Sequence, residues 1–256
     1  MTDRSGLWLL VDVSNQRTKW VTWSGGELGE VRVVATKDVV QLFEVVSDRF
    51  SGVVMASVVP AVAAEIEGRC AASDVLVVRA NPTVVQALGL MDFTTYEGRQ
   101  TLGEDRVANM IGASAMATND AVMAVDLGTA TTIEVAIRHD GWWKFSGGMI
   151  APGVNALGMY LHEKTAQLPM VNPASIDTTV SALGQTTKGA IAGALKFGYP
   201  SMVAGMVNAA IMECDGSVDI VVTGGAANFF PWAEFPAARR EELLTLRGLA
   251  RLIETR

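Results

Sequence analysis

The sequence predicts an α/β protein with two related domains that face each other across a cleft. Half of the 256 residues are apolar, which is enough for a substantial core. An apolar run that closes on an aspartate and a tight turn occurs twice, at residues 7–15 and 121–129. Each copy is followed directly by a stretch of strand propensity, at residues 18–23 and 131–137. Such a repeat is typical of a duplicated domain.

The repeat places the boundary near residue 115, so we expect a first domain over 1–115 and a second over 116–256. In the first half, the pattern of apolar residues predicts strands at 32–35, 53–59 and 75–78, and a helix at 38–50 capped by Asp38. In the second half, it predicts a strand at 142–146, helical segments at 153–161 and 189–213, a strand at 219–222 and a last helix at 249–254 that packs on the second domain.

Charge and cysteine usage narrow the function classes. The formal net charge is −7 and Lys and Arg do not cluster, so the sequence shows no footprint for nucleic acid. Cys70 and Cys214 lack the spacing of a zinc site and fit thiols in a reducing compartment. No continuous apolar stretch reaches the length of a membrane span, and no signal sequence is evident. We therefore expect a cytoplasmic protein with no membrane partner.

The two repeated turns carry the first candidate chemistry. Asp12 and Asp126 each end a buried strand and precede small or polar residues. A carboxylate in this position attracts a cation, while the N–H groups and hydroxyls of the turn meet phosphate oxygens. One strand-end aspartate is often only a turn former. Two at equivalent positions favour a clamp for a polyphosphate.

A third candidate is the Gly224-Gly225 pair, which follows an apolar run ending at Thr223. A glycine pair lets the backbone approach a ligand closely, as an adenosine-binding loop requires. The same residues are equally compatible with a plain strand-to-helix turn without a ligand.

Several motifs resemble one known family, the type III pantothenate kinases. Residues 12–19 look like the first phosphate motif of that family, and residues 126–132 are similar to its second. Tyr96 followed by Gly103-Glu104-Asp105-Arg106 has the spacing of its substrate segment, Tyr and then Gly-x-Asp-Arg. Shorter matches extend the resemblance in the same order over nearly the whole chain. It implies two duplicated actin-like (ribonuclease H-like) domains of the actin/Hsp70/sugar-kinase superfamily.

The resemblance also implies an activity: ATP-dependent phosphorylation of pantothenate to 4′-phosphopantothenate, the first step of coenzyme A biosynthesis, with Mg²⁺ and a monovalent cation, K⁺ or NH4⁺. Asp105 would be the general base, which agrees with the need for a carboxylate aligned on the acceptor hydroxyl. The other roles implied are ATP binding by Asp12, Ser14, Asn15, Gln16, Lys19, Gly128, Thr129, Gly224 and Gly225, cation binding by Asp126, and pantothenate binding by Tyr96, Gly103, Glu104, Arg106 and, across a homodimer interface, Thr187.

Three positions depart from the family pattern. Ser14 and Gln16 stand where the family usually has Gly and Thr, and Arg99 stands in place of a Pro. A non-catalytic or regulatory paralogue of the same fold is therefore an alternative. A sugar or acyl kinase of the superfamily is another, but it should lack the spacing from Tyr96 to Arg106.

Overall fold

The computed structural model describes residues 6–47 and 49–255, which form two compact units. Unit 1 combines the described residues up to Ala117 with Ala136–Ser146 and the chain from Leu243 on. Unit 2 combines Thr118–Val135 with Gly147–Glu242. The two units thus alternate along the chain.

Unit 1 contains a sheet of six strands, in which β1, β5 and β6 run parallel and β2 pairs with β1 antiparallel. Its strands are β1 (Trp8–Val13), β2 (Arg17–Ser24), β3 (Glu27–Leu28), β4 (Arg32–Ala35), β5 (Gly52–Ser57) and β6 (Leu76–Arg79). All six residues of β1 are buried, as expected for a strand between neighbours that is covered on both faces. The carboxyl ends of the three parallel strands meet at one edge of the sheet.

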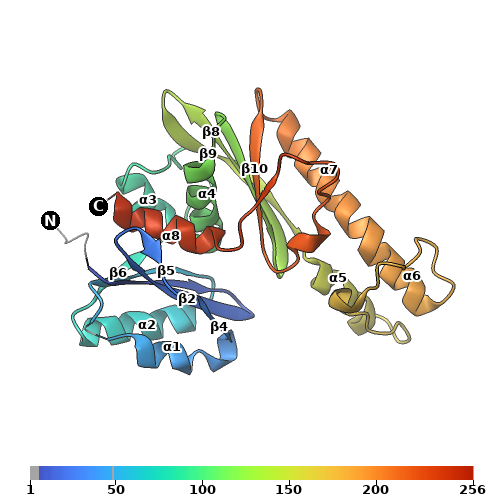
Figure 1. The fold of residues 1–256 in the computed structure, drawn as a ribbon, viewed down its shortest axis with the longest axis horizontal. Helices are drawn as coiled ribbons and strands as arrows, with labels where there is room; N and C mark the ends of the chain where they lie inside the picture. Colours follow the sequence, from blue (N-terminus) through green and yellow to red (C-terminus); the bar gives the residue numbers. More distant parts are fainter. Residues whose placement is uncertain (1–5, 48, 256) are drawn as a thin grey trace. The chain divides into compact units, whose positions relative to one another are not determined.

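Helices cover both faces of this sheet (Figure 1). The helices of unit 1 are a 3₁₀ turn at Thr36–Asp38, α1 (Val40–Val45), α2 (Pro60–Ala72), α3 (Pro82–Ala87), α4 (Glu104–Met116) and α8 (Leu244–Glu254). In Figure 1, α1 and α2 lie on one face and α8 lies on the other. Helix α8 contacts β1, β5 and α4.

Helices α4 and α8 approach each other through small residues. A Cβ atom on Gly112 of α4 would lie 2.6 Å from the carbonyl oxygen of Leu244, and one on Gly248 of α8 would overlap the backbone of Ala108. Beside this contact, the buried hydroxyl of Thr245 donates a 2.8 Å hydrogen bond to Oδ1 of Asn109. The close contact therefore depends on two glycines and one buried polar pair.

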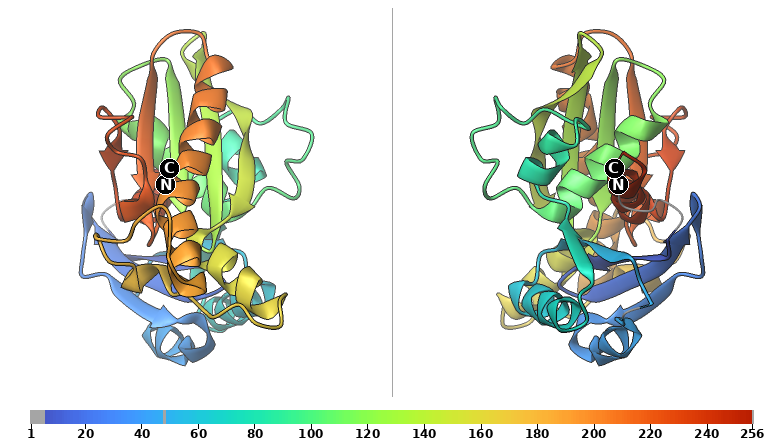
Figure 2. Two further views of the ribbon diagram at one scale, coloured as in Figure 1. Left: turned by 90° about the vertical axis from the view of Figure 1, so that its right-hand side faces the viewer. Right: turned by 90° about the vertical axis from the view of Figure 1, so that its left-hand side faces the viewer.

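Unit 2 is built on the second sheet, whose order is β11-β10-β7-β8-β9. Its strands are β7 (Ala121–Leu127), β8 (Ala130–His139), β9 (Trp142–Pro152), β10 (Val218–Thr223) and β11 (Arg239–Arg240). The tip of the β8–β9 hairpin, residues 136–146, belongs to unit 1. The helices of unit 2 are α5 (Val154–Glu163), α6 (Thr187–Gly193), a π-helical turn at Ala194–Gly198, α7 (Tyr199–Met212) and 3₁₀ turns at Pro173–Ser175 and Ala227–Phe229. Figure 2 shows α7 lying along this sheet.

The continuous helical stretch Thr187–Met212 is long and apolar enough, by length and composition alone, to cross a membrane. The core helices of soluble proteins pass the same test. Here Tyr199, Val203 and Val207 of α7 are fully or nearly fully buried, and 44% of the most apolar window is buried. We therefore interpret α7 as a core helix of unit 2.

Three features differ from the sequence-based expectations. Asp38 lies in the 3₁₀ turn and does not cap a helix: α1 begins after Val39 without a side-chain cap and ends at Val45, before a backbone that is already extended at Val46. The sequence predicts that the last helix packs on the second domain, but it belongs to unit 1 and packs on α4, β1 and β5, because its glycine fits closely against α4. Strand β9 continues beyond Ser146 to Pro152.

We expect Gly248→Ala to lower the free energy of unfolding by about 1–3 kcal/mol, because the added methyl group forces α8 away from α4. Gly68→Ala is the matched control, since Gly68 lies within α2 and a Cβ there meets nothing within 4 Å. This control should gain about 0.5–1 kcal/mol from helix propensity. Urea unfolding of both variants measures the difference, and equal effects of the two alanines would contradict the close contact.

Candidate functional site

The first predicted phosphate turn joins β1 to β2 in unit 1. Asp12 is buried and lies opposite Lys19 in the antiparallel register. The Ser14 hydroxyl donates to the carbonyl of Arg17 at 2.7 Å, and the Ser14 N–H donates to the same carbonyl at 3.1 Å. Asn15 and Gln16 are exposed at the tip of the turn.

The departure at Ser14 is compatible with this turn. Among the described non-glycine residues, a positive φ occurs only at Asp74 and Asp140, so Ser14 does not need the conformational freedom of glycine. Its hydroxyl closes the turn and leaves the N–H groups of the tip at the surface. The structure thus gives no reason to consider this turn disabled.

The predicted substrate segment leads into α4 at the same edge of the unit 1 sheet. Val13 of β1 pairs with Ser57 of β5, and the Ser57 N–H donates a 2.9 Å hydrogen bond to Oε2 of Glu104. The start of α4 therefore lies at the carboxyl ends of β1 and β5, next to the first turn. A Cβ atom on Gly103 would lie 2.5 Å from Oδ1 of Asp105, so a larger residue there would require the Asp105 carboxylate to move.

Asp105 occupies the first turn of α4, with Arg106 directly after it. Burial raises the pKa of the Asp105 carboxyl above its usual value, and the N–H and the charge of Arg106 oppose this shift only in part. The Arg106 N–H lies 2.8 Å from Oδ1 of Asp105. A carboxylate with a raised pKa is a stronger proton acceptor, which suits a general base.

Tyr96 is half-buried and packs by its edge on Phe145, with ring centroids 4.9 Å apart and an interplanar angle of 87°. Its N–H donates to the carbonyl of Phe93 at 3.0 Å. Phe145 lies in the hairpin tip that belongs to unit 1. Tyr96 is thus fixed within the same unit as Asp105.

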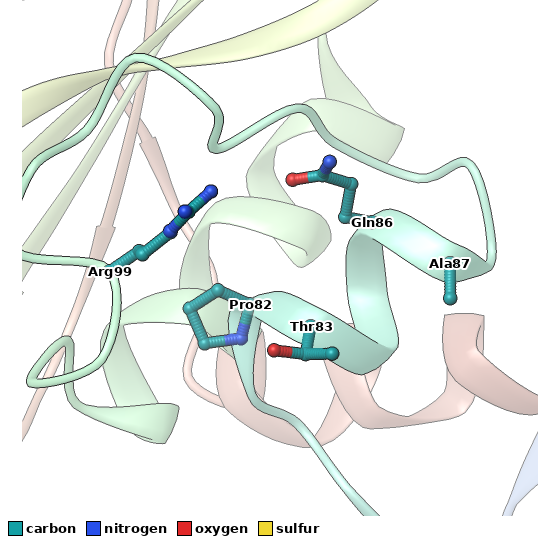
Figure 3. Close-up of a pocket in the computed structure, with 5 residues that line it drawn as sticks. All are labelled: Pro82, Thr83, Gln86, Ala87 and Arg99. Atoms are coloured by element: carbon teal, nitrogen blue, oxygen red, sulfur yellow. The ribbon is translucent and has the colours of Figure 1, made fainter.

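Two adjoining pockets open beside the start of α4. The larger has a volume of about 700 Å³ and lies between Ser57, Arg79, Gly103 and Glu104, whereas Tyr96, Asp105 and Arg106 do not line it. The smaller, of about 360 Å³, is lined by Pro82, Thr83, Gln86, Ala87 and Arg99. Figure 3 shows the side chains of Arg99 and Gln86 reaching toward one another in it. Pro82, Thr83 and Arg99 line both pockets, so the two are neighbours.

The second predicted turn joins β7 to β8 in unit 2. Asp126 pairs with Thr223 of the parallel strand β10, so the turn and the Gly224-Gly225 loop lie at the same sheet edge. Gly224 has a φ of +95°, and a Cβ there would lie 2.5 Å from Oδ1 of Asp126. The Ala226 N–H donates to the carbonyl of Leu127 at 2.9 Å, which holds the loop on the strand.

Around this turn, the exposed Thr129 accepts a hydrogen bond at its carbonyl from the Gly153 N–H at 3.2 Å. A Cβ on Gly225 would meet nothing within 4 Å, so its backbone faces open space. The structure therefore brings Asp126, Gly128, Thr129, Gly224 and Gly225 together in unit 2. Thr187 lies elsewhere in that unit, exposed as the first residue of α6.

Sequence reasoning missed Arg79, and it missed the close approach at Gly153, where a Cβ atom would overlap the carbonyl oxygen of Gly128. Arg79 ends β6, lines the larger pocket and bonds Glu104 at 2.9 Å. A charged residue that closes an apolar strand at a ligand-binding sheet edge was the available signal.

Comparison with solved structures defines the class of fold. MreB 5 of Spiroplasma citri matches with a TM-score of 0.52 at 10% identity, covering 98% of this chain and 97% of that chain. Component A of the (R)-2-hydroxyglutaryl-CoA dehydratase of Acidaminococcus fermentans matches with a TM-score of 0.52 at 14% identity. The match covers 98% of this chain and 97% of that chain. Together with the two α/β units, these likenesses identify an actin-like fold.

Sequence comparison then identifies the family. The model of the family "Type III pantothenate kinase" matches residues 8–209. The type III pantothenate kinase of Chlorobaculum parvum is 30% identical over 96% of this chain and 93% of its own length. The type III pantothenate kinase of Methylacidiphilum infernorum is 31% identical over 94% of this chain and 86% of its own length. The chain belongs to the type III pantothenate kinase family, a family of enzymes.

The raised pKa of Asp105 gives a stability prediction. The Asp105 carboxyl binds its proton more tightly in the folded state than in the unfolded state. Ionisation of Asp105 therefore lowers the stability of the fold as the pH rises from the usual aspartate pKa through the raised pKa. At pH 7 we therefore expect Asp105→Asn to be more stable than the wild type, with the difference shrinking in acid.

Asp219→Asn is the control of opposite sign. Burial alone would raise the pKa of the Asp219 carboxyl, but hydrogen bonds from the N–H groups of Asn119 and Thr118 outweigh burial and lower it. These two nitrogen atoms lie 2.7 and 2.6 Å from Oδ2 of Asp219. Its ionised form therefore stabilises the fold at neutral pH and loses this effect in acid. Urea unfolding at several pH values should show the two variants shifting in opposite directions, and a less stable Asp105→Asn at pH 7 would contradict the assigned shift.

Proposed function

We propose that the protein transfers the γ-phosphoryl group of ATP to the primary hydroxyl group of pantothenate, giving 4′-phosphopantothenate in the first step of coenzyme A biosynthesis. The observation that carries this proposal is the position of Gly103-Glu104-Asp105-Arg106. This chain belongs to the family, and its segment starts a helix at the carboxyl ends of β1 and β5. The segment lies beside a turn suited to phosphate and next to an open pocket.

On the acceptor side, we propose that Asp105 is the general base. Its raised pKa favours proton transfer from the hydroxyl group as the phosphoryl group arrives. Tyr96, Arg106 and Thr187 would bind pantothenate, with the guanidinium of Arg106 suited to a carboxylate. Gly103 leaves room for the Asp105 carboxylate. Glu104 lines the pocket with its own carboxylate already bonded, so it would shape the acceptor site.

On the nucleotide side, each strand-end turn by itself would offer groups that bind phosphate. The tip of the first turn offers Ser14, Asn15 and Gln16, with Lys19 on β2 as a cation. The second offers Gly128 and Thr129, and the open backbone at Gly224-Gly225 suits the adenosine moiety.

The donor set fits Mg²⁺ held chiefly by the nucleotide. No group of three or more acidic, His or Cys residues forms a metal cage within residues 6–47 and 49–255. Mg²⁺ in kinases is bound by one or two carboxylates together with substrate phosphates, and Asp12 provides such a carboxylate. When bound, Mg²⁺ neutralises charge on the phosphates.

Asp126 would hold the monovalent cation, K⁺ or NH4⁺. Turnover should therefore fall when Na⁺ is the only monovalent cation.

We further propose that the protein works as a cytoplasmic homodimer whose partner covers an apolar patch of unit 2. The proposed patch consists of exposed large apolar side chains on α5, on the π-helical turn before α7 and on the loops between them, namely Met159, Tyr160, Met170, Leu183 and Phe197. Large exposed apolar patches mark interaction surfaces. Thr187 starts α6 within the same region, which supports its role at a shared acceptor site.

Replacing the base tests the reaction. We expect Asp105→Asn to lower kcat for pantothenate-dependent ATP consumption about 10²- to 10⁴-fold, since the amide cannot accept the proton. The KM for ATP should stay near the wild-type value. Asp38→Asn, an exposed carboxylate in the 3₁₀ turn, is the control and should keep full activity. Undiminished turnover by Asp105→Asn would remove Asp105 from the chemistry.

Charges placed in the apolar patch test the dimer. We expect Leu183→Glu combined with Phe197→Glu to convert a dimer into monomers in sedimentation velocity, because two buried carboxylates would be costly at the interface. Met212→Glu is the control, since Met212 is 87% exposed at the far end of α7. A monomeric wild type at micromolar concentration would contradict the proposal.

A further inference from the structure

We propose that Arg79 is a positioning residue: it fixes the first turn of α4 through Glu104 and thereby orients Asp105 toward the acceptor. This inference rests on the proposed function, because it concerns the geometry of the proposed base. It adds a residue that the substrate motif does not contain.

Arg79 binds two carboxylates with separate parts of its guanidinium group. Nε and Nη2 both lie 2.9 Å from Oε2 of Glu104, and Nη1 lies 2.7 Å from Oε1 of Glu67. The side chains of Arg79 and Glu104 are only 28% and 12% exposed. Arg79 thus connects β6 to α2 on one side and to the start of α4 on the other.

The side chain of Glu104 anchors the beginning of α4. Gly103 provides no side-chain cap, and Glu104 is the first helical residue. Its Oε2 accepts from Arg79 and from the Ser57 N–H at 2.9 Å, which ties the helix to β6 and β5 together. Asp105 follows on the same turn, so any displacement of Glu104 moves the base as well.

Loss of Arg79 would act locally. The body of α4 is held by α8 at Gly112 and by the Asn109–Thr245 hydrogen bond, neither of which involves Arg79. Removing the guanidinium leaves the Glu104 carboxylate poorly paired in a mostly buried position, next in sequence to Asp105. The first turn should then loosen while the helix remains folded. A shift of about 1 Å in a catalytic group can cost about 10²-fold in rate.

The test compares Arg79→Gln with a graded set of variants. Arg79→Lys keeps the charge, and Glu67→Gln removes the other partner of Arg79 but leaves the bond to Glu104. Arg69→Gln is the matched control, because it breaks the exposed Arg69–Glu65 pair on α2, 2.8 Å long, and touches nothing at α4. Each variant is assayed for kcat and KM with ATP and pantothenate, and for amide hydrogen exchange over residues 103–107.

We expect Arg79→Gln to lower kcat about 10- to 100-fold with an unchanged KM for ATP, and to speed exchange in the first turn of α4. Arg79→Lys should restore part of kcat, Glu67→Gln should lose less than Arg79→Gln, and Arg69→Gln should match the wild type. A higher KM for pantothenate with unchanged kcat and exchange would show that Arg79 contacts the substrate directly, and would overturn the proposal. Faster exchange throughout α4 and α8 would overturn it too, since it would show a general stabilising role.

Failure of the proposed function is distinguishable from failure of this inference. A wild type without pantothenate-dependent turnover would refute the reaction, while exchange in Arg79→Gln would still decide whether Arg79 orders the turn that bears Asp105. A wild type that turns over pantothenate, together with unchanged kcat and exchange in Arg79→Gln, would refute the positioning role alone.

Discussion

The proposed acceptor site depends on how the start of helix α4 is fixed. One carboxylate oxygen of Glu104 accepts hydrogen bonds from the N–H of Ser57 and the guanidinium of Arg79, so a single oxygen atom joins α4 to two parallel strands. Behind this anchor, glycines let α8 press against α4, which leaves the helix little freedom to slide. The proposed base, Asp105, therefore lies on a rigid element, where a fixed geometry is easier to maintain than on a loop.

The two proposed phosphate turns have the same arrangement of strand, aspartate and turn in both units. In each, an aspartate near the end of a buried strand pairs with a parallel neighbour, Ala56 for Asp12 and Thr223 for Asp126, and a hairpin turn follows. Their details differ. Ser14 closes the first turn with its hydroxyl, whereas the second relies on glycines that give Asp126 and the β10 loop room to meet. This difference explains how a serine can stand in the first turn without strain.

The sequence predicted the parts of the fold that local patterns determine. Strands β1, β2, β4 and β10 lie where alternating or continuous apolar runs predict them, and the actin-like fold and the family are confirmed. The sequence did not predict contacts between distant residues. Arg79 bonds Glu104 from 25 positions away, and α8 packs on α4 across more than half the chain. The cap expected from Asp38 is absent because the chain there first makes a 3₁₀ turn. The roles of the individual site residues remain predictions.

The proposed activity requires pantothenate to bind beside the start of α4 and to receive the phosphoryl group of ATP there. Mass spectrometry of a reaction with ATP, pantothenate, Mg²⁺ and K⁺ is the most direct test. We expect 4′-phosphopantothenate and ADP in equal amounts. ADP without phosphorylated pantothenate, or no ADP from folded protein at high ATP, would contradict it.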